Sequence, residues 1–496
     1  MSKGYLFLIG GGTDSSFIFN RMFELAGGKD NSRVAIIPSA SSHIGSTIND
    51  YEEYFIKELG LKKENVWSVP LAETDDPETL NVNEGEWKDN AYHKEMAGKI
   101  IDYNIIFFVG GDQRRYIDVL KRNNIDSPLL LAIEGIYNNG GIIAGTSAGT
   151  NILCKTSIGG GRSEEALLNR VVYKAEDDDG AELLILNGLG LIDNIIFDTH
   201  FETRGRLGRL SDAAVITGNK YGIGISEKTA VILYADLTTE VVGYGSVLMV
   251  DLSNARQISQ PKKQLHAREI NVTLLTHGDK YNLTTKQFTP CAGKTSIINT
   301  PYFDANDYHI SLNVFKEYET SQILVNDLLD NEAKDVIALM NYDREFEHGD
   351  ISSFIRFIKT DTTQSWFGKI KLEEADDSLN NYSGTNILLD IIPLKYIMET
   401  QKAKSFNAVI FGIENDNMQV VVFDNNESLP ICDAKIFVCD ANGTLLLKKG
   451  SDRYGRLFIR NLLKDGGNVT VKITYDNEER TTSFVFEPDM TGICLF

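Results

Sequence analysis

The residues most clearly equipped for chemistry in this chain are Gly145-Thr146-Ser147-Ala148-Gly149. They follow a short apolar run, 142–144, typical of a buried strand, and apolar residues resume at Ile152 with room for a helix. A serine on such a turn has strained backbone geometry, so its neighbours must be small and its hydroxyl is exposed at the helix N-terminus. The pattern predicts a nucleophilic serine with amides nearby that can hold an oxyanion, although a bare G-x-S-x-G match is more often an ordinary loop.

Two further residues, a histidine and a glutamate, could supply the base and the carboxylate that such a serine needs. His200 follows a predicted strand at 195–197, and Glu227 follows one at 221–225. A serine hydroxyl needs a base, an imidazole with a pKa of about 6.5 suits that task, and a carboxylate can fix the imidazole tautomer. Because all three residues follow strands, we expect one edge of one sheet to gather them. The alternative interpretations are a core histidine and a surface carboxylate.

The order serine, histidine, glutamate differs from the order serine, acid, histidine of α/β-hydrolases. An α/β-hydrolase interpretation would need a later base, His266 or His277. Neither histidine follows a comparably clear strand.

The elements that must position these residues begin at the N-terminus, where short apolar runs alternate with helical patterns. This alternation predicts βαβ units and a parallel sheet with helices on both faces, in which ligands bind beyond the carboxyl ends of the strands. The expected strands are 5–9, 34–37, 66–69 and 105–109, and the expected helices include 17–26 and 51–59.

Two glycine-rich turns fall at these strand ends. Gly10-Gly11-Gly12 does not complete a G-x-G-x-x-G dinucleotide motif, because position 15 is Ser15, so nucleotide binding is not favoured. Gly110-Gly111-Asp112-Gln113 precedes a helix expected near Arg114, and its amides point to the same sheet edge as Ser147.

Composition limits the class of protein. The 496 residues suggest about three domains, at roughly 150 residues each. A formal net charge of −21 disfavours nucleic acid as a partner. The five cysteines form no C-x-x-C pair, so neither a structural zinc site nor a disulfide framework is expected. No secretory pattern and no membrane-length apolar run occur, which predicts a cytoplasmic protein.

An acidic run at 176–179 lies within a polar stretch, 159–180. Such a run is usually a solvated loop, and it could also hold guanidinium groups. Three arginines, Arg204, Arg206 and Arg209, follow His200, an unusual concentration in so acidic a chain.

Taken in order, these motifs resemble the successive signatures of the cyanophycinases, serine exopeptidases related to the aspartyl dipeptidases. The resemblance covers the chain to about residue 285 and implies an α/β fold with a mostly parallel sheet, in a layout like glutamine amidotransferases or flavodoxin. It implies that Ser147 is the nucleophile, His200 the general base and then acid, and Glu227 the residue that orients His200. The Ala148 amide, with one from Gly111 or Asp112, would form the oxyanion hole. The implied substrate-binding residues are Gln113, Asp198, Thr199, Arg204, Arg206 and Arg209.

The resemblance also implies a homodimer that needs no metal or cofactor, and cyanophycin as substrate. This polymer is a polyaspartate with arginine on each β-carboxyl, and its cleavage from the C-terminal end releases β-aspartyl-arginine dipeptides. Arginines would bind the carboxylates by bidentate hydrogen bonds, and Asp198 could receive the guanidinium group.

Two positions depart from the family pattern. Thr199 stands where the family usually has glutamine, and Ser226 stands where it usually has aspartate. A peptidase for other aspartyl or isoaspartyl peptides is therefore an alternative, and an inactive binding protein that keeps the pocket is a third. Retention of all three triad residues argues against the inactive protein.

Residues 286–403 form a middle region without an assigned function. Helical spacing occurs at 323–329 and 336–340, whereas 354–358 fits a strand or a helix. From residue 404 onward the sequence alternates with period two, with Ala434, Ile436 and Val438 facing one way and a hairpin turn expected at Asn442-Gly443. This stretch weakly resembles β-sandwich modules of the transthyretin-like type, suited to polymer binding, dimer contacts or simple packing.

Overall fold

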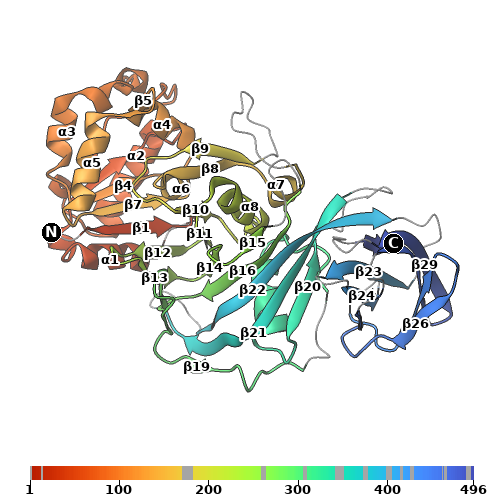
Figure 1. The fold of residues 1–496 in the computed structure, drawn as a ribbon. Coiled ribbons are helices and arrows are strands. Elements are labelled where there is room, and N and C mark those ends of the chain that lie inside the picture. Colours follow the sequence, from red (N-terminus) through yellow and green to blue (C-terminus); the bar gives the residue numbers. More distant parts are fainter. Residues whose placement is uncertain are drawn as a thin grey trace.

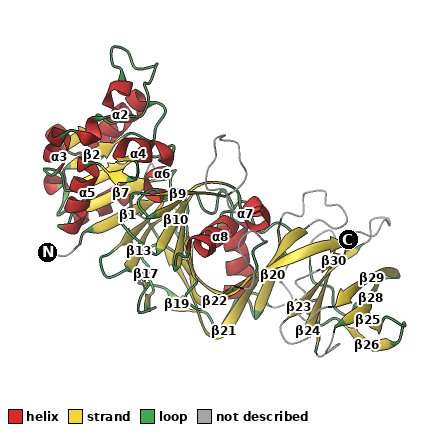
Figure 2. Cartoon of the chain, turned by 45° about the horizontal axis from the view of Figure 1, so that its top comes forward, coloured by secondary structure: helices red, strands yellow, loops and turns green. Residues whose placement is uncertain are grey.

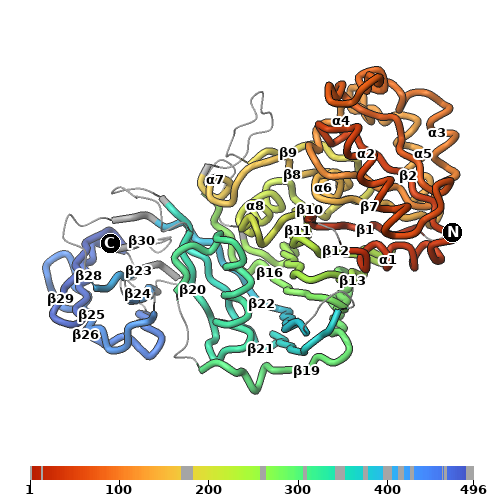
Figure 3. Tube along the Cα trace, turned by 180° about the vertical axis from the view of Figure 1, so that it is seen from behind, coloured from red at the N-terminus to blue at the C-terminus, as the bar shows by residue number. Residues whose placement is uncertain are grey.

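The computed structural model is a mixed α/β protein with several sheets and a strand-rich C-terminal region. It describes residues 3–12, 15–169, 183–257, 264–304, 310–340, 351–372, 378–397, 405–413, 417–424, 429–460, 462, 466–486 and 493–495. The acidic run at 176–179 lies outside these residues. The molecule is elongated, with the red N-terminal strands and the blue C-terminal strands at opposite ends (Figures 1 and 3).

The first sheet contains nine strands and holds the predicted N-terminal strands in its parallel half. Four neighbouring pairs are parallel, and the four pairs from β1 outward through β12 are antiparallel. In spatial order the strands are β18 (Phe288–Thr289), β17 (Lys280–Asn282), β13 (Thr238–Gly243), β12 (Thr229–Leu233), β1 (Tyr5–Ile9), β7 (Ile142–Thr146), β4 (Ile105–Phe108), β2 (Val34–Ile37) and β3 (Val66–Ser68).

This order corrects the expected layout. The parallel strands lie in the order β3-β2-β4-β7-β1. A flavodoxin-like sheet, with its five strands numbered along the chain, has the order 2-1-3-4-5. Only half of the pairs are parallel, because short connections such as the one between β12 and β13 return the chain as hairpins, which join antiparallel strands.

Helices pack on this sheet (Figure 2), and both predicted helices are present. The second begins earlier than expected, at Ile44, and continues as a π-helical segment, η2 (Tyr54–Glu58). The helices are α1 (Ser16–Leu25), α2 (Ile44–Glu53), α3 (Lys94–Ile100), α4 (Gln113–Leu120), α5 (Pro128–Asn138) and α6 (Ala148–Asn151), with 3₁₀ turns at Lys29–Asn31, Lys63–Asn65, Glu84–Trp87 and Asn90–Tyr92, and a two-stranded ribbon of β5 (Lys121–Arg122) and β6 (Ile125–Asp126).

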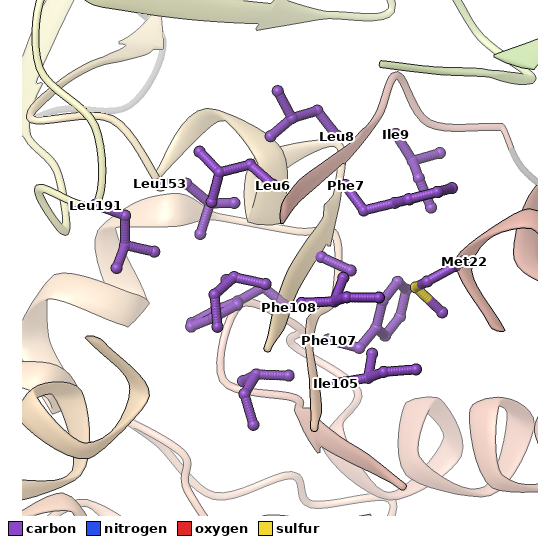
Figure 4. Close-up of a cluster of buried hydrophobic side chains, with 14 of the residues drawn as sticks. Leu6, Phe7, Leu8, Ile9, Met22, Ile105, Phe107, Phe108, Leu153 and Leu191 are labelled. Atoms are coloured by element: carbon purple, nitrogen blue, oxygen red, sulfur yellow. The ribbon is translucent and has the colours of Figure 1, made fainter. Parts of the chain in front are cut away.

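Alternating side chains fill both faces of the sheet. Phe7 and Phe107 point toward Met22 of α1, while Leu6 points to the opposite face, where Leu153 and Leu191 lie (Figure 4). All six residues are buried. Burial on both faces explains why the strands of this half are continuous apolar runs.

A second sheet, of thirteen strands, begins beside the first and extends into the C-terminal region. Its path runs β10 (Ile195–Thr199), β11 (Tyr221–Ile225), β14 (Val247–Asp251), β16 (Ala267–Leu275), β22 (Leu379–Ile397), β30 (Ile493–Leu495), β23 (Phe406–Ile413), β24 (Asn417–Asp424) and β27 (Arg456–Ile459). Off this path lie β15 (Arg256–Gln257), β19 (Thr295–Ser296), β20 (Asp335–Leu339) and β21 (Ile351–Ile370). Near it lie α7 (Ser163–Asn169), α8 (Leu207–Thr217), and the hairpin of β8 (Thr156–Gly160) and β9 (Leu184–Asn187).

The middle region adds β20, β21, β22, α9 (Glu319–Gln322) and the π-helix η7 (Ile323–Leu329). The prediction of helical structure at 323–329 is confirmed, and 354–358 lies in β21. The helix predicted at 336–340 is wrong, because these residues form β20, which pairs with β21 and is buried throughout. Periodicity does not separate a fully buried strand from a buried helix in so short an apolar run.

The C-terminal region is rich in strands, as predicted. The strands β25 (Lys435–Asp440), β26 (Leu445–Gly450), β28 (Gly467–Tyr475) and β29 (Glu478–Phe486) form a four-stranded sheet that shares one apolar core with β23, β24 and β27. The hairpin at Asn442-Gly443 is present, and Gly443 has the positive φ (78°) that such a turn requires. The boundaries at residues 285 and 403 stay predictions, since β16 and β22 continue one sheet across the first of them.

Among the described residues, no helix has both the length and the apolar character that crossing a membrane requires.

Candidate active site

Ser147 lies on a sharp turn between β7 and α6. Its φ is 52°, outside the range that non-glycine residues normally adopt, and its amide donates to the Ile9 carbonyl at 3.1 Å. A Cβ on Gly145 would lie 2.2 Å from the Gly149 carbonyl oxygen, and a Cβ on Gly149 would lie 2.2 Å from that of Phe108. Glycine is therefore required at both flanking positions. The helix that follows is shorter than the sequence predicted. It ends at Asn151, before the apolar residues that begin at Ile152.

His200 follows β10, and its imidazole bridges the serine and a carboxylate. The Ser147 Oγ lies 2.8 Å from His200 Nε2, and His200 Nδ1 lies 2.6 Å from Glu227 Oε1. The His200 side chain is mostly buried, with 15% of its surface exposed, and that of Glu227 is 32% exposed. The structure thus brings these three side chains into one hydrogen-bonded chain.

The three residues come from two sheets, which corrects the expectation that one sheet edge gathers them. Ser147 follows β7 of the nine-stranded sheet, whereas His200 and Glu227 follow β10 and β11 of the thirteen-stranded sheet. The residue type that follows a strand does not reveal which sheet the strand joins, because pairing depends on the path of the whole chain.

The turn Gly10-Gly11-Gly12 at the end of β1 joins the two sheets. The Gly10 carbonyl accepts from the His200 amide at 2.8 Å, and the Gly11 carbonyl accepts from the Lys228 amide at 2.9 Å. A Cβ on Gly11 would lie 2.3 Å from His200 Cε1, and one on Gly12 would lie 2.9 Å from Glu227 Oε2. Sequence reasoning assigned this turn no role at the site. The signal was present as three successive glycines at a strand end, where a close approach requires the missing side chains.

The electrostatic surroundings favour a neutral imidazole beside an ionised carboxylate. Burial lowers the pKa of His200, and the charges of Arg204 and Arg206 lower it further, while the hydrogen bond to Glu227 opposes them. The hydrogen bond with His200 lowers the pKa of Glu227, although partial burial opposes that effect. A neutral imidazole next to a serine hydroxyl is ready to accept its proton.

Thr203 is a further residue that sequence reasoning missed. Its Oγ1 lies within hydrogen-bonding distance of two acceptors, Glu227 Oε1 at 3.2 Å and the His200 carbonyl at 3.1 Å. The hydroxyl therefore ties the carboxylate to the backbone of the histidine that the carboxylate contacts. The sequence signal for Thr203 was only its position, three residues after His200.

The amides near Ser147 differ in their availability to an oxyanion. The Asp112 amide donates to the Ala40 carbonyl at 2.9 Å, so it is already engaged, and the Asp112 carboxylate caps α4 by accepting from the Arg114 amide. Gly111 and Ala148 line the cavity beside Ser147. Of the two amides predicted as the second donor, the geometry therefore favours Gly111 over Asp112.

A cavity of about 420 Å³ opens next to Ser147. Five of the six predicted substrate residues line it, and Asp198 does not. Within the described residues, its lining side chains include no carboxylate and four arginines. The lining residues are Gly111, Gln113, Ser147, Ala148, Asn151, Gly159, Gly160, Gly161, Arg162, Thr199, His200, Arg204, Arg206 and Arg209.

Asp198 is committed to the protein itself, which corrects its predicted contact with substrate. It is fully buried and accepts from Arg209 Nε at 2.7 Å, Arg209 Nη2 at 2.5 Å, Arg206 Nη1 at 3.3 Å and the Thr199 amide at 2.9 Å. The carboxylate balances the guanidinium groups of Arg206 and Arg209, and its oxygens already accept hydrogen bonds from the protein. Sequence spacing did not reveal that Arg209, eleven residues away, folds back on Asp198.

Three polar atoms at this cavity have no hydrogen-bond partner within the described part of the chain. They are Thr199 Oγ1, Asn151 Oδ1 and Arg206 Nε, all buried. Gln113, by contrast, donates from Nε2 to the Ile158 carbonyl at 2.6 Å. Asn151 and Arg162 were not predicted as site residues, and no motif at the sequence level distinguished them.

The two later histidines have other contacts. His277 Nδ1 accepts from the Gly243 amide at 3.3 Å, and His266 Nε2 lies 3.4 Å from Arg268 Nε. The imidazole at hydrogen-bonding distance from Ser147 is that of His200. In the described ranges, no group of three His, Cys, Asp or Glu side chains is placed to hold a metal ion.

Comparisons with known proteins relate the N-terminal part of the chain to peptidases. Residues 6–241 match the model of Peptidase family S51. A cyanophycinase from Geminocystis herdmanii is 32% identical over 301 residues, covering 59% of this chain and 97% of that protein. A cyanophycinase from Synechococcus elongatus is 30% identical over 293 residues, covering 58% and 81%. A solved structure, described as a peptidase from an acI-B1 Actinobacterium, is 22% identical with a TM-score of 0.38, covering 57% of this chain and 98% of that chain.

Proposed function

Because the chain belongs to peptidase family S51, and is thus a serine-type peptidase, we propose that it is an exopeptidase that hydrolyses cyanophycin to β-aspartyl-arginine dipeptides. The proposed catalytic residues are Ser147, His200 and Glu227. The observation that carries the proposal is the hydrogen-bonded chain from hydroxyl to imidazole to carboxylate, at 2.8 and 2.6 Å, beside an arginine-lined cavity.

In the first half of the reaction, Ser147 Oγ attacks the scissile carbonyl carbon while His200 Nε2 accepts the hydroxyl proton. The imidazolium is stabilised by Glu227, whose hydrogen bond to Nδ1 also fixes the tautomer. The protonated His200 then gives its proton to the leaving amine, which leaves an acyl-enzyme on Ser147. A water molecule, deprotonated by His200, hydrolyses that ester and restores the free serine.

The oxyanion of each tetrahedral intermediate would be held by the amides of Ala148 and Gly111. Both residues line the cavity beside Ser147, and Ala148 is the first residue of α6, where helix amides lack intrahelical partners. Removal of one donor from such a site typically raises the barrier by about 3 kcal/mol.

The arginines of the cavity would recognise the carboxylates of an aspartyl substrate. Guanidinium groups bind carboxylates by paired charge-assisted hydrogen bonds, and the walls of this cavity carry Arg162, Arg204, Arg206 and Arg209. Thr199 would contact the substrate through Oγ1, the buried hydroxyl that has no hydrogen-bond partner among the described residues.

A second candidate function, a peptidase for other aspartyl or isoaspartyl peptides, is favoured by one observation. No described lining side chain is a carboxylate, and Asp198 is occupied by Arg206 and Arg209. The cavity therefore offers charge to a substrate carboxylate but none to a substrate guanidinium. An acidic peptide without arginine fits this charge distribution equally well.

The test is an assay of the purified protein with insoluble cyanophycin and, in parallel, with soluble β-aspartyl and α-aspartyl peptides. Release of β-aspartyl-arginine, identified by mass spectrometry, is the result expected from the proposed function. Turnover of the small peptides alone would instead establish the second candidate.

The matched variants are Ser147→Ala and Ser253→Ala. Ser253 is an exposed serine whose hydroxyl donates to the Asp251 carboxylate, so its replacement should leave activity unchanged. Ser147→Ala should abolish turnover of every substrate. Hydrolysis by Ser147→Ala at the wild-type rate would overturn the proposed mechanism.

A further inference from the structure

The middle region packs directly against the loop that carries the histidine and the arginines of the site. The Tyr318 amide donates to the Glu202 carbonyl at 3.0 Å, and the Ser321 amide donates to Glu202 Oε2 at 3.2 Å. Glu202 lies two residues after His200 and is only 3% exposed. We call residues 200–206, between β10 and α8, the catalytic loop. Its Glu202 side chain is therefore bound by a segment more than a hundred residues later in the chain.

Two glycines allow this close approach. A Cβ on Gly205 would lie 1.8 Å from the Phe315 carbonyl oxygen, and one on Gly208 would lie 2.8 Å from Phe315 Cζ. Gly205 also has a positive φ of 53°. The contact is thus backbone against backbone, and any side chain at Gly205 would force the two segments apart.

The middle-region side of the contact is itself constrained. Tyr318 has a φ of 60°, a left-handed conformation that a tyrosine rarely adopts, and Thr320 Oγ1 donates to the Val314 carbonyl at 3.0 Å. A residue keeps such a conformation when the surrounding contacts impose it. Phe315 is buried in the core cluster that also contains Phe201 of the catalytic loop.

The loop has a separate anchor on its inner side. Asp198 holds Arg206 and Arg209, Arg209 Nη1 donates to the Gly161 carbonyl at 2.7 Å, and Ser163 Oγ donates to the Gly205 carbonyl at 2.6 Å. Arg206 and Arg209 therefore have contacts that hold them independently of the middle region. The middle region instead holds the turn at Glu202.

That turn includes the residue that touches the proposed triad. The Oγ1 of Thr203, adjacent to Glu202, lies within hydrogen-bonding distance of both the Glu227 carboxylate and the His200 carbonyl. A displacement of Glu202 would move Thr203 and would loosen the contact between Glu227 and His200. Hydrogen bonds and the adjacent residues Glu202 and Thr203 thus connect the middle region to the imidazole.

We propose that residues 313–321 of the middle region are a positioning element for catalysis, and that Glu202 is the positioning residue through which they act on Thr203, Glu227 and His200. The inference rests on the proposed function, since it concerns the activation of Ser147. It assigns a role to a part of the chain that lies outside the match to the family model.

The variants follow from the chemistry of Glu202. Burial raises the pKa of its carboxyl group, and hydrogen bonds from Ser321 oppose that effect. Glu202→Gln keeps a side-chain oxygen that can accept from the Ser321 amide, whereas Glu202→Ala removes it. Ser365→Ala is the matched control, because it removes another buried hydrogen bond of the middle region, from Oγ to the Leu329 carbonyl at 2.9 Å, that does not involve Glu202.

The measurement is the rate at which a fluorophosphonate labels Ser147 in the full-length protein, read by intact mass. In this reaction Ser147 Oγ forms a bond to phosphorus, the P–F bond breaks, fluoride leaves, and the serine proton passes to His200. The readout depends on activation of the serine and not on knowledge of the substrate. Ser147→Ala defines the background.

We expect Glu202→Ala to be labelled about 10- to 100-fold more slowly than wild type, because small displacements of catalytic groups cost rates of that order. Glu202→Gln and Ser365→Ala should be labelled at rates close to wild type. With a turned-over substrate, Glu202→Ala should lower kcat with little change in KM, since Arg206 and Arg209 keep their inner anchor.

Labelling of folded Glu202→Ala at the wild-type rate would overturn the inference while leaving the proposed function intact. If wild type itself is not labelled, the proposed nucleophile is wrong and the inference falls with it. Should Glu202→Ala fail to fold by circular dichroism, Phe315→Leu tests the same contact more gently. It should then slow labelling, and a rate equal to that of Ser365→Ala would overturn the inference.

Discussion

At the scale of single residues, the proposed mechanism makes the reactivity of Ser147 depend on the charges around His200. Burial and two arginines favour the neutral imidazole, and Glu227 opposes them. The same loop carries Asp198, whose carboxylate is enclosed by Arg206 and Arg209. Within residues 198–209, the proposed role of His200 is proton transfer, whereas Asp198 balances the charges of Arg206 and Arg209.

The pH profile of kcat/KM should show an acid limb below the ordinary imidazole pKa of about 6.5, because His200 must be neutral to accept the serine proton. Arg204→Gln removes a charge that lowers the His200 pKa, so its acid limb should move to higher pH. Glu227→Gln removes the carboxylate that raises the pKa, so the limb of its residual activity should move to lower pH. Shifts of both variants in one direction would contradict this assignment of charges.

Asp198→Asn should mainly destabilise the fold, because it leaves two buried guanidinium groups without their carboxylate. Breaking a buried ion pair from one side costs about 3–5 kcal/mol. Asp193→Asn is the control, since Asp193 pairs with Lys155 at the surface, where both side chains are more than half exposed and such a pair contributes about 1 kcal/mol or less. Urea denaturation measures both. A raised KM with unchanged stability in Asp198→Asn would mean that the carboxylate contacts substrate after all.

At the scale of elements, close packing restricts the turn between β7 and α6. Its two glycines pack against backbone carbonyl groups, and Ser147 between them has a positive φ. The sequence predicted this turn and the flanking strand from local pattern alone. It did not predict β20, because five consecutive buried residues satisfy a strand and a buried helix equally well.

Gly149→Ala should destabilise the protein by about 1–3 kcal/mol through overpacking, since the new Cβ would lie 2.2 Å from the Phe108 carbonyl oxygen. It should also reduce activity, because relief of the clash displaces Ser147. Gly135→Ala is the control: Gly135 lies within α5 with no atom near the site of a new Cβ, so alanine should stabilise that helix by up to about 1 kcal/mol. Thermal unfolding compares the two. Equal melting temperatures would contradict the tight packing described for the turn.

At the scale of the whole molecule, one sheet connects the candidate active site to the C-terminal strands, and buried ion pairs join its parts. Asp335 of β20 accepts from Arg356 of β21 at 2.7 Å and also pairs with Arg456 of β27. These three residues join the middle region to the C-terminal region. Buried contacts therefore join segments that are far apart in the sequence. Residues 313–321 contact Glu202 in the same way.

Arg456→Met should weaken the attachment of the C-terminal strands by about 1.5–3 kcal/mol, the usual contribution of a hydrogen bond to a charged group. Calorimetry should then resolve an earlier transition for this region, while labelling of Ser147 stays at the wild-type rate. Arg453→Met is the control, because Arg453 is exposed and donates to the hydroxyl of the neighbouring Tyr454. Identical scans for the two variants would show that the buried pair does not hold the regions together.

What the sequence by itself determined was local: the apolar strands, the small residues around Ser147, and a histidine and a glutamate placed after strands. These features depend on a few adjacent residues, so pattern suffices to find them. Only the tertiary structure decided that two different sheets supply the three side chains, that Gly10-Gly11-Gly12 lies beneath them, and that Asp198 faces inward to its own arginines. It also decided that Glu202 is bound by the middle region. Such contacts join residues far apart along the chain, and their geometry follows from how whole elements pack rather than from the residue types at either end.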